Sequence, residues 1–363
     1  MIKFLKHLIA VLVIATVVDD CILAGNDDIL KQKLLDFLQQ KYTVSMLGNL
    51  NWFLGVHYQK QSDGSILAVQ TAYVDKALKT FGLTDCKPSK VPMDSNFKVL
   101  QSDLDMNPPK ERVDEYRKKI GALIWVQLWT RPDISYATNL LARYTLYCSE
   151  KLLAAVNKVW LYLKFTKDLG IRFAPDDAFN YGLNTLVCYS DASDADCLIT
   201  RRSTGGHALF FNSSPTAWRS KRQNLASLST MDSETVEVCA AVQQVKHVQN
   251  ILAGLGFPQT STPIHVDNQA SIKTAENPCM QQHTKHLGRR YAFVREAVED
   301  KDVMLIFTPG KVNIADIFTK PLPYAHFVYL RTLLLNCRSS DIQRLQREAQ
   351  DSRDPEEDHY FDD

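Results

Sequence analysis

The sequence predicts an α/β fold with a mixed five-stranded sheet and flanking helices over residues 184–330, preceded by an α+β region over residues 1–166. Two observations predict this fold. Beyond residue 184, short apolar runs of β type alternate with runs of helical spacing. Acidic residues stand at the ends of two β-type runs and within two helical runs, so they would meet at one sheet edge. The expected strands are 186–190, 208–212, 216–218, 263–266 and 303–307, and the expected helices are 233–255, 269–274, 284–299 and 313–319.

The sequence of the first part of the chain predicts shorter elements, both helices and strands. A β-hairpin is expected over residues 1–26, with Asp19 and Asp20 at its turn. Pro132 separates two helical runs, because proline breaks a helix. The expected helices are 29–42, 73–81, 116–128, 135–147 and 152–166, with strand character at 52–56 and a proline-rich loop at 84–115. Residues 167–183 predict a linker, and the acidic residues 338–363 predict a disordered tail.

Composition limits the function classes. The 363 residues suit two or three domains, and the net charge of +1 is far from that of a strongly basic nucleic-acid binder. A surface for nucleic acid would therefore be a local basic patch. The eight cysteines are scattered without any C-x-x-C pair, which predicts free thiols in a reducing, intracellular compartment rather than disulfides or a zinc site.

The N-terminal apolar run has two interpretations. Lys3 and Lys6 precede the run 8–18, which has some likeness to a signal peptide and would suit a secreted protein. The run is too short to span a membrane, and no small-residue cleavage site follows it. A buried strand followed by an acidic turn explains the segment better, and no membrane partner is expected.

Four acidic residues far apart in sequence predict one catalytic centre. Asp191 and Asp267 end β-type runs, and Glu234 and Asp316 fall in helical runs. Taken singly, Asp267 suits a helix N-cap and Asp316 suits the dipole of the last helix. Taken together, four carboxylates at one edge predict a site for two divalent ions that act on a phosphodiester, and hard oxygen ligands favour Mg²⁺.

The local motifs add a family resemblance. Residues 189–323 resemble the RNase H domain at the end of a copia-type LTR retrotransposon polyprotein, and residues 11–165 resemble the reverse transcriptase segment before it. The first set of matching stretches is Tyr189-Ser190-Asp191-Ala192, Thr200 to Gly206, Leu225 to Glu234, Val266-Asp267-Asn268-Gln269, Thr284-Lys285-His286 and Ala315 to Pro323. The second set is Val18-Asp19-Asp20, Leu47-Gly48, Phe53-Leu54-Gly55, Val91-Pro92-Met93-Asp94 and Thr130 to Ala137.

The resemblance implies hydrolysis of RNA in RNA–DNA hybrids by two-metal catalysis. It implies that Asp191 bridges both Mg²⁺ ions, that Glu234 and Asp267 complete the shell of one ion, and that Asp316 completes that of the other. Side chains expected to contact the nucleic acid are Ser203, Thr204, Trp218, Lys221, Arg222 and Lys311. An ordinary solvated surface charge is an equally good interpretation of each basic residue.

The resemblance also implies a reverse transcriptase remnant. Asp19 and Asp20 match the paired aspartates of a polymerase palm hairpin, but the segment before them is too short for the strand that supplies a further aspartate. We therefore expect no DNA polymerase activity from this chain alone, and the upstream portion of the polyprotein is an expected partner. Departures from the family pattern at Asp194, Thr235 and Gly288 leave open an alternative, a decayed relic that at most binds nucleic acid.

Overall fold

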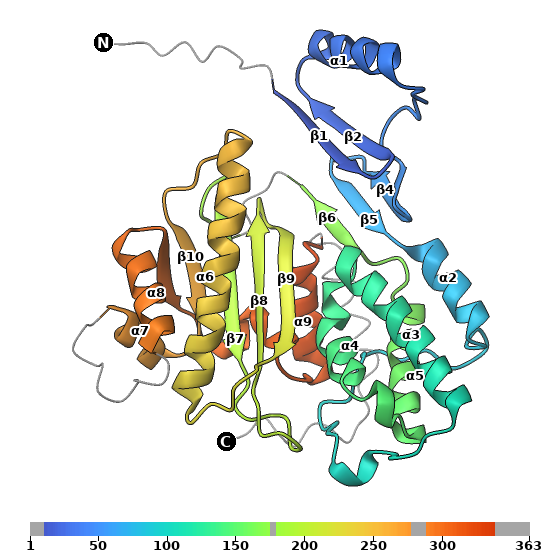
Figure 1. The fold of residues 1–363 in the computed structure, drawn as a ribbon, viewed down its shortest axis with the longest axis vertical. Coiled ribbons are helices and arrows are strands. Elements are labelled where there is room, and N and C mark those ends of the chain that lie inside the picture. Colours follow the sequence, from blue (N-terminus) through green and yellow to red (C-terminus); the bar gives the residue numbers. More distant parts are fainter. Residues whose placement is uncertain (1–10, 175–178, 277–287, 338–363) are drawn as a thin grey trace. The chain divides into compact units, whose positions relative to one another are not determined.

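The computed structural model describes residues 11–174, 179–276 and 288–337 (Figure 1). It divides into two compact units, Met1–Tyr58 and Gln59–Asp363. Three sequence expectations fall outside the described residues: the start of the signal-like run, the Thr284-Lys285-His286 motif and the acidic tail 338–363.

The first unit contains a hairpin and a helix. Strand β1 (Leu12–Val17) pairs antiparallel with β2 (Asp20–Gly25), and Val17 lies opposite Asp20, so the expected hairpin forms. Asp20 begins β2, and the two-residue turn is Val18-Asp19 rather than Asp19-Asp20. Helix α1 (Asp28–Lys41) begins at Asp27, whose side chain accepts a hydrogen bond from the Leu30 amide. No side chain of α1 is buried, so this helix adds nothing to a core within the described residues.

Strands β3 (Trp52–Phe53) and β4 (Val56–Lys60) form a further antiparallel pair. In the second unit, β5 (Ile66–Val69) pairs antiparallel with β6 (Ile171–Phe173). The segment expected as a linker therefore contains a strand.

Helices follow β5 largely as the sequence predicts. They are α2 (Thr71–Thr80), α3 (Lys110–Trp129), α4 (Ser135–Ala142) and α5 (Glu150–Phe165). A 3₁₀ turn at Pro132–Ile134 separates α3 from α4, as the proline predicts. The helix expected over 135–147 is shorter, because α4 ends at Ala142 and a separate 3₁₀ turn, Thr145–Tyr147, follows.

The mixed five-stranded sheet is confirmed. Its strands are β7 (Leu186–Ala192), β8 (Thr204–Phe211), β9 (Ser214–Arg222), β10 (Thr262–Val266) and β11 (Val303–Phe307). Their spatial order is β11-β10-β7-β8-β9. The pairs β7–β8 and β8–β9 are antiparallel, whereas β10 is parallel to both β7 and β11. Every residue of β7 is buried, as expected of a central strand covered on both faces.

Helices cover both faces of this sheet (Figure 1). Helices α6 (Thr230–Gly254) and α8 (Gly288–Glu299) pack on one face, where Leu186 and Cys188 of β7 belong to their core cluster. The alternate residues Val187 and Tyr189 belong to the core on the other face, as the two-residue period of a strand requires. That second core includes the 3₁₀ helix η7 (Ile314–Phe318) and helix α9 (Tyr324–Leu334). Helix α7 (Gln269–Glu276) follows β10 and contacts α8.

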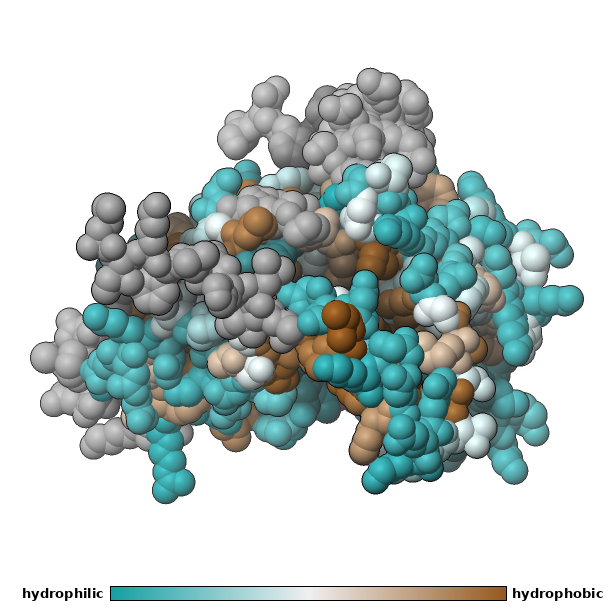
Figure 2. All heavy atoms as spheres, turned by 90° about the horizontal axis from the view of Figure 1, so that it is seen from above, coloured by the Kyte–Doolittle hydropathy of each residue, from teal (hydrophilic) through white to brown (hydrophobic). Residues whose placement is uncertain are grey.

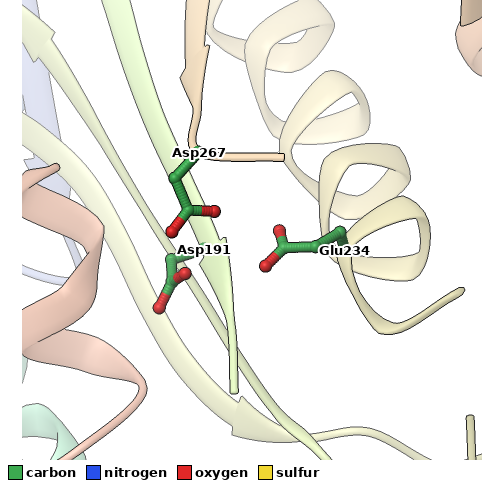
Figure 3. A group of neighbouring side chains, drawn as sticks. All are labelled: Asp191, Glu234 and Asp267. Carbon is green, nitrogen blue, oxygen red and sulfur yellow. The ribbon is translucent and has the colours of Figure 1, made fainter. Parts of the chain in front are cut away.

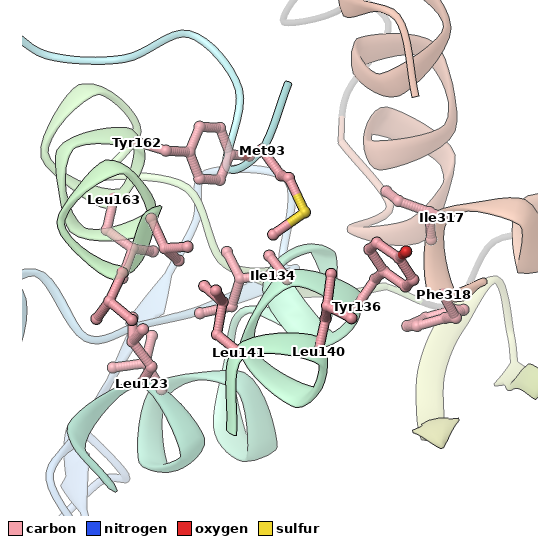
Figure 4. Close-up of a cluster of buried hydrophobic side chains, with 14 of the residues drawn as sticks. Met93, Leu123, Ile134, Tyr136, Leu140, Leu141, Tyr162, Leu163, Ile317 and Phe318 are labelled. Carbon is pink, nitrogen blue, oxygen red and sulfur yellow. The ribbon is translucent and has the colours of Figure 1, made fainter. Parts of the chain in front are cut away.

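The second core also includes the helices that precede the sheet. Figure 4 shows Ile317 and Phe318 of η7 beside Tyr136 of α4, and all three belong to one buried cluster. That cluster runs from Val74 to Leu334. Residues 167–183 therefore do not separate two hydrophobic cores, and the division of function between 1–166 and 184–330 stays a prediction.

The face seen in Figure 2 has mainly hydrophilic side chains, with hydrophobic ones scattered among them. Among the described helices, none combines the length and the apolar character that crossing a bilayer requires. The seven described cysteines are all free thiols.

Candidate active site

Asp191 and Asp267 lie level with one another at one edge of the sheet. Strand β10 runs parallel to β7 with Ile264 opposite Cys188 and His265 opposite Tyr189. When this register is continued by two residues along both strands, Asp267 comes to lie opposite Asp191. Because parallel strands end at the same edge, the expectation that these two aspartates meet follows from the strand order.

Glu234 reaches this edge from α6. The helix begins at Ser229, whose hydroxyl accepts a 3.2 Å hydrogen bond from the Asp232 amide, and Glu234 lies in its second turn. Its Oε1 atom accepts a 3.2 Å hydrogen bond from the amide of Ala192, the residue that ends β7. Its Oε2 atom is buried and has no hydrogen-bond partner in the described part of the chain.

These three carboxylates form one group. One oxygen from each of Asp191, Glu234 and Asp267 lies within 4.8 Å of the other two. Figure 3 shows Glu234 pointing from α6 toward the two aspartates at the strand edge. A buried carboxylate oxygen without a partner is costly, and a divalent cation between the three groups would satisfy it. The donor set of hard oxygens therefore fits a divalent metal ion.

Asp316 borders the same place from η7, although it is not one of the three grouped carboxylates. A Cβ atom on Gly310 would lie 3.3 Å from Asp267 Oδ2 and 4.0 Å from Asp316 Oδ2, so both carboxylates border this glycine. The element differs from the expected helix over 313–319, because it is a five-residue 3₁₀ helix. Pro321 and Pro323 follow closely, and proline cannot continue an α-helix.

Asn313 fixes η7 to the central strand. Its side-chain oxygen accepts a 3.0 Å hydrogen bond from the Ala315 amide, which caps the 3₁₀ helix. Its Nδ2 atom donates a 3.0 Å hydrogen bond to the carbonyl of Ser190, the neighbour of Asp191. One fully buried side chain thus sets the distance between Asp316 and the end of β7.

Two further residues of this segment contact the carboxylates. The hydroxyl of Thr319 donates a short hydrogen bond to Asp191 Oδ2. The Nζ atom of Lys320 lies 3.0 Å from Asp316 Oδ1 and 4.0 Å from Asp191 Oδ2. Sequence reasoning gave neither residue a role, although both belong to the quoted stretch Ala315 to Pro323.

Gly206 makes room for this arrangement. It lies opposite Asp191 in the β7–β8 ladder. A Cβ atom at Gly206 would lie 2.4 Å from Phe318 Cβ and 3.1 Å from Thr319 Cγ2. The absence of a side chain on β8 therefore lets η7 approach the sheet closely enough for Thr319 to reach Asp191.

Burial and mutual repulsion raise the pKa values of the clustered carboxyls. Burial, and then the charge of Asp191, raises the pKa of Asp316 to about 8. Burial, and then the charges of Asp191 and Asp267, raises the pKa of Glu234 well above its usual range. The pKa of Asp267 is also raised, first by burial and then by Asp191. Without a metal ion, Asp316 therefore keeps its proton near neutral pH, and the surroundings of Glu234 and Asp267 also favour their protonated forms.

A second buried polar pair lies on the α6 face of the sheet. His207 Nδ1 and Glu237 Oε1 are 2.7 Å apart, and both side chains are almost completely buried. Glu237 lies one turn after Glu234 on α6. A Cβ atom on Gly205 would lie 2.0 Å from Glu237 Oε2, so this glycine admits the pair. Sequence reasoning missed the pair, because nothing local links a strand histidine to a helix glutamate thirty residues away.

Ser203 and Thr204, expected to contact a phosphate, are buried. The Ser203 hydroxyl accepts a 3.0 Å hydrogen bond from the Ala195 amide, and Thr204 Oγ1 accepts one of 3.0 Å from Arg143. Both side chains therefore organise the connection between β7 and β8. Their contact with a phosphate stays a prediction.

The other four expected nucleic-acid contacts differ in exposure. Lys221 and Lys311 are exposed. Arg222 is half-buried, and its Nη1 atom lies 3.7 Å from the sulfur of Cys197. The Nε1 atom of Trp218 donates a 3.0 Å hydrogen bond to the carbonyl of Gln127, so this ring packs on α3.

The position of Lys221 on β9 relates it to the carboxylates. Ser220, Gly206 and Asp191 are in register across β9, β8 and β7. Lys221 is therefore at the same end of the sheet as Asp191, about two strand spacings or roughly 10 Å away.

Asp19 and Asp20, the expected polymerase remnant, are exposed residues of the first unit.

Comparisons with known proteins assign the family. The family described as reverse transcriptase (RNA-dependent DNA polymerase) matches residues 5–95. The retrovirus-related Pol polyprotein from transposon RE2 of Arabidopsis thaliana is 30% identical over 85% of this chain, which is 21% of that protein. An uncharacterized mitochondrial protein of Arabidopsis thaliana is 30% identical over 60% of this chain and 86% of its own length. The chain belongs to the copia-type retrotransposon Pol polyprotein family.

This Pol polyprotein chain spans about a fifth of the length of the curated polyproteins that it matches. Among solved structures, it is similar to the foamy viral protease-reverse transcriptase in complex with RNA/DNA hybrid, at 12% identity over 85% of this chain and 37% of that one, with a TM-score of 0.46. It is also similar to the N-terminal RNase H domain of a Mycobacterium tuberculosis protein, at 14% identity over 37% of this chain and 90% of that one, with a TM-score of 0.29.

The fold class is the one that the sequence predicts. The second unit contains the expected α/β arrangement, with the mixed sheet order β11-β10-β7-β8-β9 and helices on both faces. Three of the four predicted carboxylates form its only group of three or more candidate metal ligands among the described residues.

Proposed function

We propose that this Pol polyprotein chain is a ribonuclease H that hydrolyses the RNA strand of RNA–DNA hybrids. The observation that supports it most is the carboxylate group of Asp191, Glu234 and Asp267, with oxygens within 4.8 Å and a buried Glu234 oxygen that lacks a partner among the described residues. Such a group at the edge of an RNase H-like sheet suits phosphodiester hydrolysis.

The cofactor would be Mg²⁺, held as two ions. Asp191, Glu234 and Asp267 would hold one ion, and Asp191 with Asp316 would hold the other. Bound there, the metal supplies positive charge that offsets the negative charge on the attacking and leaving oxygens.

The chain itself supplies rigid placement of the ligands. Asn313 ties η7 to the Ser190 carbonyl, and Thr319 orients the Asp191 carboxylate by donating to its Oδ2 atom. Ala192 orients Glu234 from the end of β7. Because these partners are backbone groups or buried side chains, the ligands need little rearrangement when a cation binds.

The substrate would lie across the same end of the sheet. Lys221 and Lys311 are exposed cations, and Lys221 is about two strands from Asp191. Contacts of lysine and arginine with phosphates position a nucleic acid without reading its sequence. We expect Arg222 to assist them and Trp218, Ser203 and Thr204 to support the surface from beneath.

The first unit would be a reverse transcriptase remnant without polymerase activity. Asp19 and Asp20 are exposed on the hairpin, and helix α1 buries no side chain within the described residues. Exposed apolar side chains of this unit, including Ile29 and Phe37, would pack on the upstream portion of a longer polyprotein. Nucleotide incorporation by the purified chain on a primed RNA template would disprove the absence of polymerase activity.

The deciding experiment for the nuclease measures cleavage of a hybrid with a labelled RNA strand by the full chain in Mg²⁺. Asp191→Asn is the matched control, because it keeps the size of the side chain and removes its charge. We expect cleavage by the wild type that the variant loses. A cooperatively folded wild type without cleavage would support the relic interpretation, in which the carboxylates are inherited without a working site.

A further inference from the structure

Lys320 brings a positive charge into the carboxylate site. Its Nζ atom lies 3.0 Å from Asp316 Oδ1 and 4.0 Å from Asp191 Oδ2. Among the described residues, it is the only lysine or arginine whose nitrogen lies within 4.0 Å of any of the four site carboxylates. The cation therefore lies between the two carboxylates that are proposed to share the second metal ion.

Backbone hydrogen bonds at the end of η7 fix the position from which the Lys320 side chain extends. The amides of Thr319 and Lys320 both donate to the Asp316 carbonyl, at 3.2 and 3.3 Å, and so close a turn at the end of η7. The Thr319 hydroxyl donates to the same Asp191 oxygen that Lys320 approaches. Two consecutive residues thus contact the Asp191 edge that faces Asp316.

The four carboxylates are unequally neutralised. The three grouped carboxylates, Asp191, Glu234 and Asp267, have no ion pair within the described chain other than the 4.0 Å approach of Lys320 to Asp191. Asp316 already has a cation at hydrogen-bonding distance. An ion bound to Asp316 Oδ1 at the usual Mg–O distance of about 2.1 Å would lie within roughly 5 Å of the present Nζ position. The two positive charges would repel each other at that distance.

We propose that Lys320 is a tethered cation that occupies the second-ion position between Asp191 and Asp316 and competes with the second divalent ion. The site then takes one ion readily in the Asp191, Glu234 and Asp267 group and a second ion only when Lys320 withdraws. This inference rests on the proposed metal-dependent function.

Lys320 is able to withdraw. Its side chain is 42% exposed, whereas those of Asp191 and Asp316 are only 3% and 4% exposed. The amine therefore reaches inward from the surface on a flexible four-carbon stem. A nucleic-acid phosphate beside the site would offer the displaced ammonium a new partner, so substrate binding and uptake of the second ion would occur together.

The test is a titration of the full chain with Mn²⁺ alone, with free Mn²⁺ measured by electron paramagnetic resonance. Mn²⁺ prefers the same oxygen ligands as Mg²⁺. For the wild type we expect one tight ion and a second that binds at least about tenfold more weakly. Lys320→Met should lower the dissociation constant of the second ion by about tenfold, towards that of the first. Lys320→Arg keeps the charge and should behave as the wild type does.

Lys311→Met is the matched control. It removes one exposed lysine charge from the neighbouring 3₁₀ helix η6 (Gly310–Val312) without removing an ion pair to the four carboxylates. We expect it to change the second constant less than about twofold, because exposed charges are screened. Two equal constants in the wild type, or the same small change in Lys320→Met and Lys311→Met, would overturn the inference.

Hybrid cleavage by the same wild-type preparation separates this inference from the proposed function. If the wild type cleaves the hybrid but Lys320→Met does not change Mn²⁺ binding, the role of Lys320 is rejected and the nuclease function stands. If Lys320→Met strengthens binding of the second ion but the wild type does not cleave, the nuclease function is rejected and the role of Lys320 as a tethered cation stands. Thermal melting of each variant confirms that a changed constant comes from a folded chain.

Discussion

Arg331 on α9 donates a 3.1 Å hydrogen bond from Nη1 to the hydroxyl of Tyr162 on α5, although 169 residues separate them in sequence. Tyr162 donates in turn to Asp133 Oδ2, and Arg131 forms two hydrogen bonds with the Asp133 carboxylate. All four side chains are almost completely buried. This network joins the helices before the expected linker to the helix after the sheet, so the two parts should unfold together.

Asp133→Asn should therefore destabilise the whole second unit. The substitution leaves the buried Arg131 guanidinium without its counter-charge, and breaking a buried ion pair costs about 3–5 kcal/mol. Urea denaturation followed by circular dichroism measures the loss. Asp94→Asn is the control, because it breaks the exposed pair with Lys158 and should cost less than about 1 kcal/mol. Equal losses in the two variants would contradict the role of the network.

The metal-free chain should lose stability as the pH rises. Burial and Asp191 raise the pKa of Asp316 to about 8, and the pKa values of Glu234 and Asp267 are raised too. Between about pH 4 and pH 8, the folded chain then holds protons that the unfolded chain has released, so the free energy of unfolding falls with rising pH.

Thermal melting in EDTA at about pH 5.5 and about pH 8 tests this dependence. Mg²⁺ should raise the melting temperature more at the higher pH, because fewer protons compete for the carboxylates. Asp316→Asn removes one titrating group and should flatten the metal-free dependence. A melting temperature that rises over this pH range in EDTA would contradict the prediction.

Glu234→Gln should separate metal binding from stability. The amide keeps the shape of the side chain and cannot ionise, and burial, Asp191 and Asp267 already disfavour the charged form of Glu234, so the metal-free chain should be at least as stable as the wild type. The stabilisation by Mg²⁺ should shrink, and hybrid cleavage should fall by at least about 10- to 100-fold.

Glu237→Gln, one helical turn away, is the contrasting variant. It removes the charged partner of buried His207 and should cost about 1–3 kcal/mol in the free energy of unfolding while the response to Mg²⁺ remains. Loss of the Mg²⁺ response in Glu237→Gln alone would show that the wrong glutamate has been assigned to the metal.

Gly206→Ala should push η7 away from the sheet. The added Cβ atom would meet Phe318 Cβ at 2.4 Å, so either β8 or η7 has to shift, at a cost of about 1–3 kcal/mol. The shift should also weaken Mn²⁺ binding, because Thr319 and Asp316 move with η7.

Gly121→Ala provides the control for that substitution. It lies within α3, nothing is within 4 Å of its added Cβ, and alanine favours a helix by about 1 kcal/mol. Gly121→Ala should therefore stabilise the chain and leave Mn²⁺ binding unchanged. If Gly206→Ala and Gly121→Ala had the same stability and the same affinity for Mn²⁺, the structural importance of the close approach at Gly206 would be refuted.

The sequence by itself predicted the five strands of the sheet in order and the three carboxylates that group at its edge. Asp191 is the last residue but one of β7, Asp267 directly follows β10, and Glu234 lies in the second turn of α6, close to where strand and helix periodicity predict them. These signals are local, because the run of apolar residues and the capping serine Ser229 lie within a few positions of the residue concerned.

Only the tertiary structure decided which distant residues contact the site. Thr319 and Lys320 reach Asp191 across more than a hundred residues of sequence, and Gly206 permits this because it happens to lie opposite Asp191 on β8. The core shared by the helices and the sheet has the same origin. Side-chain periodicity predicts which face of an element is buried, but it does not say which other element covers that face. Such partners are settled by packing and by the need to satisfy buried polar groups.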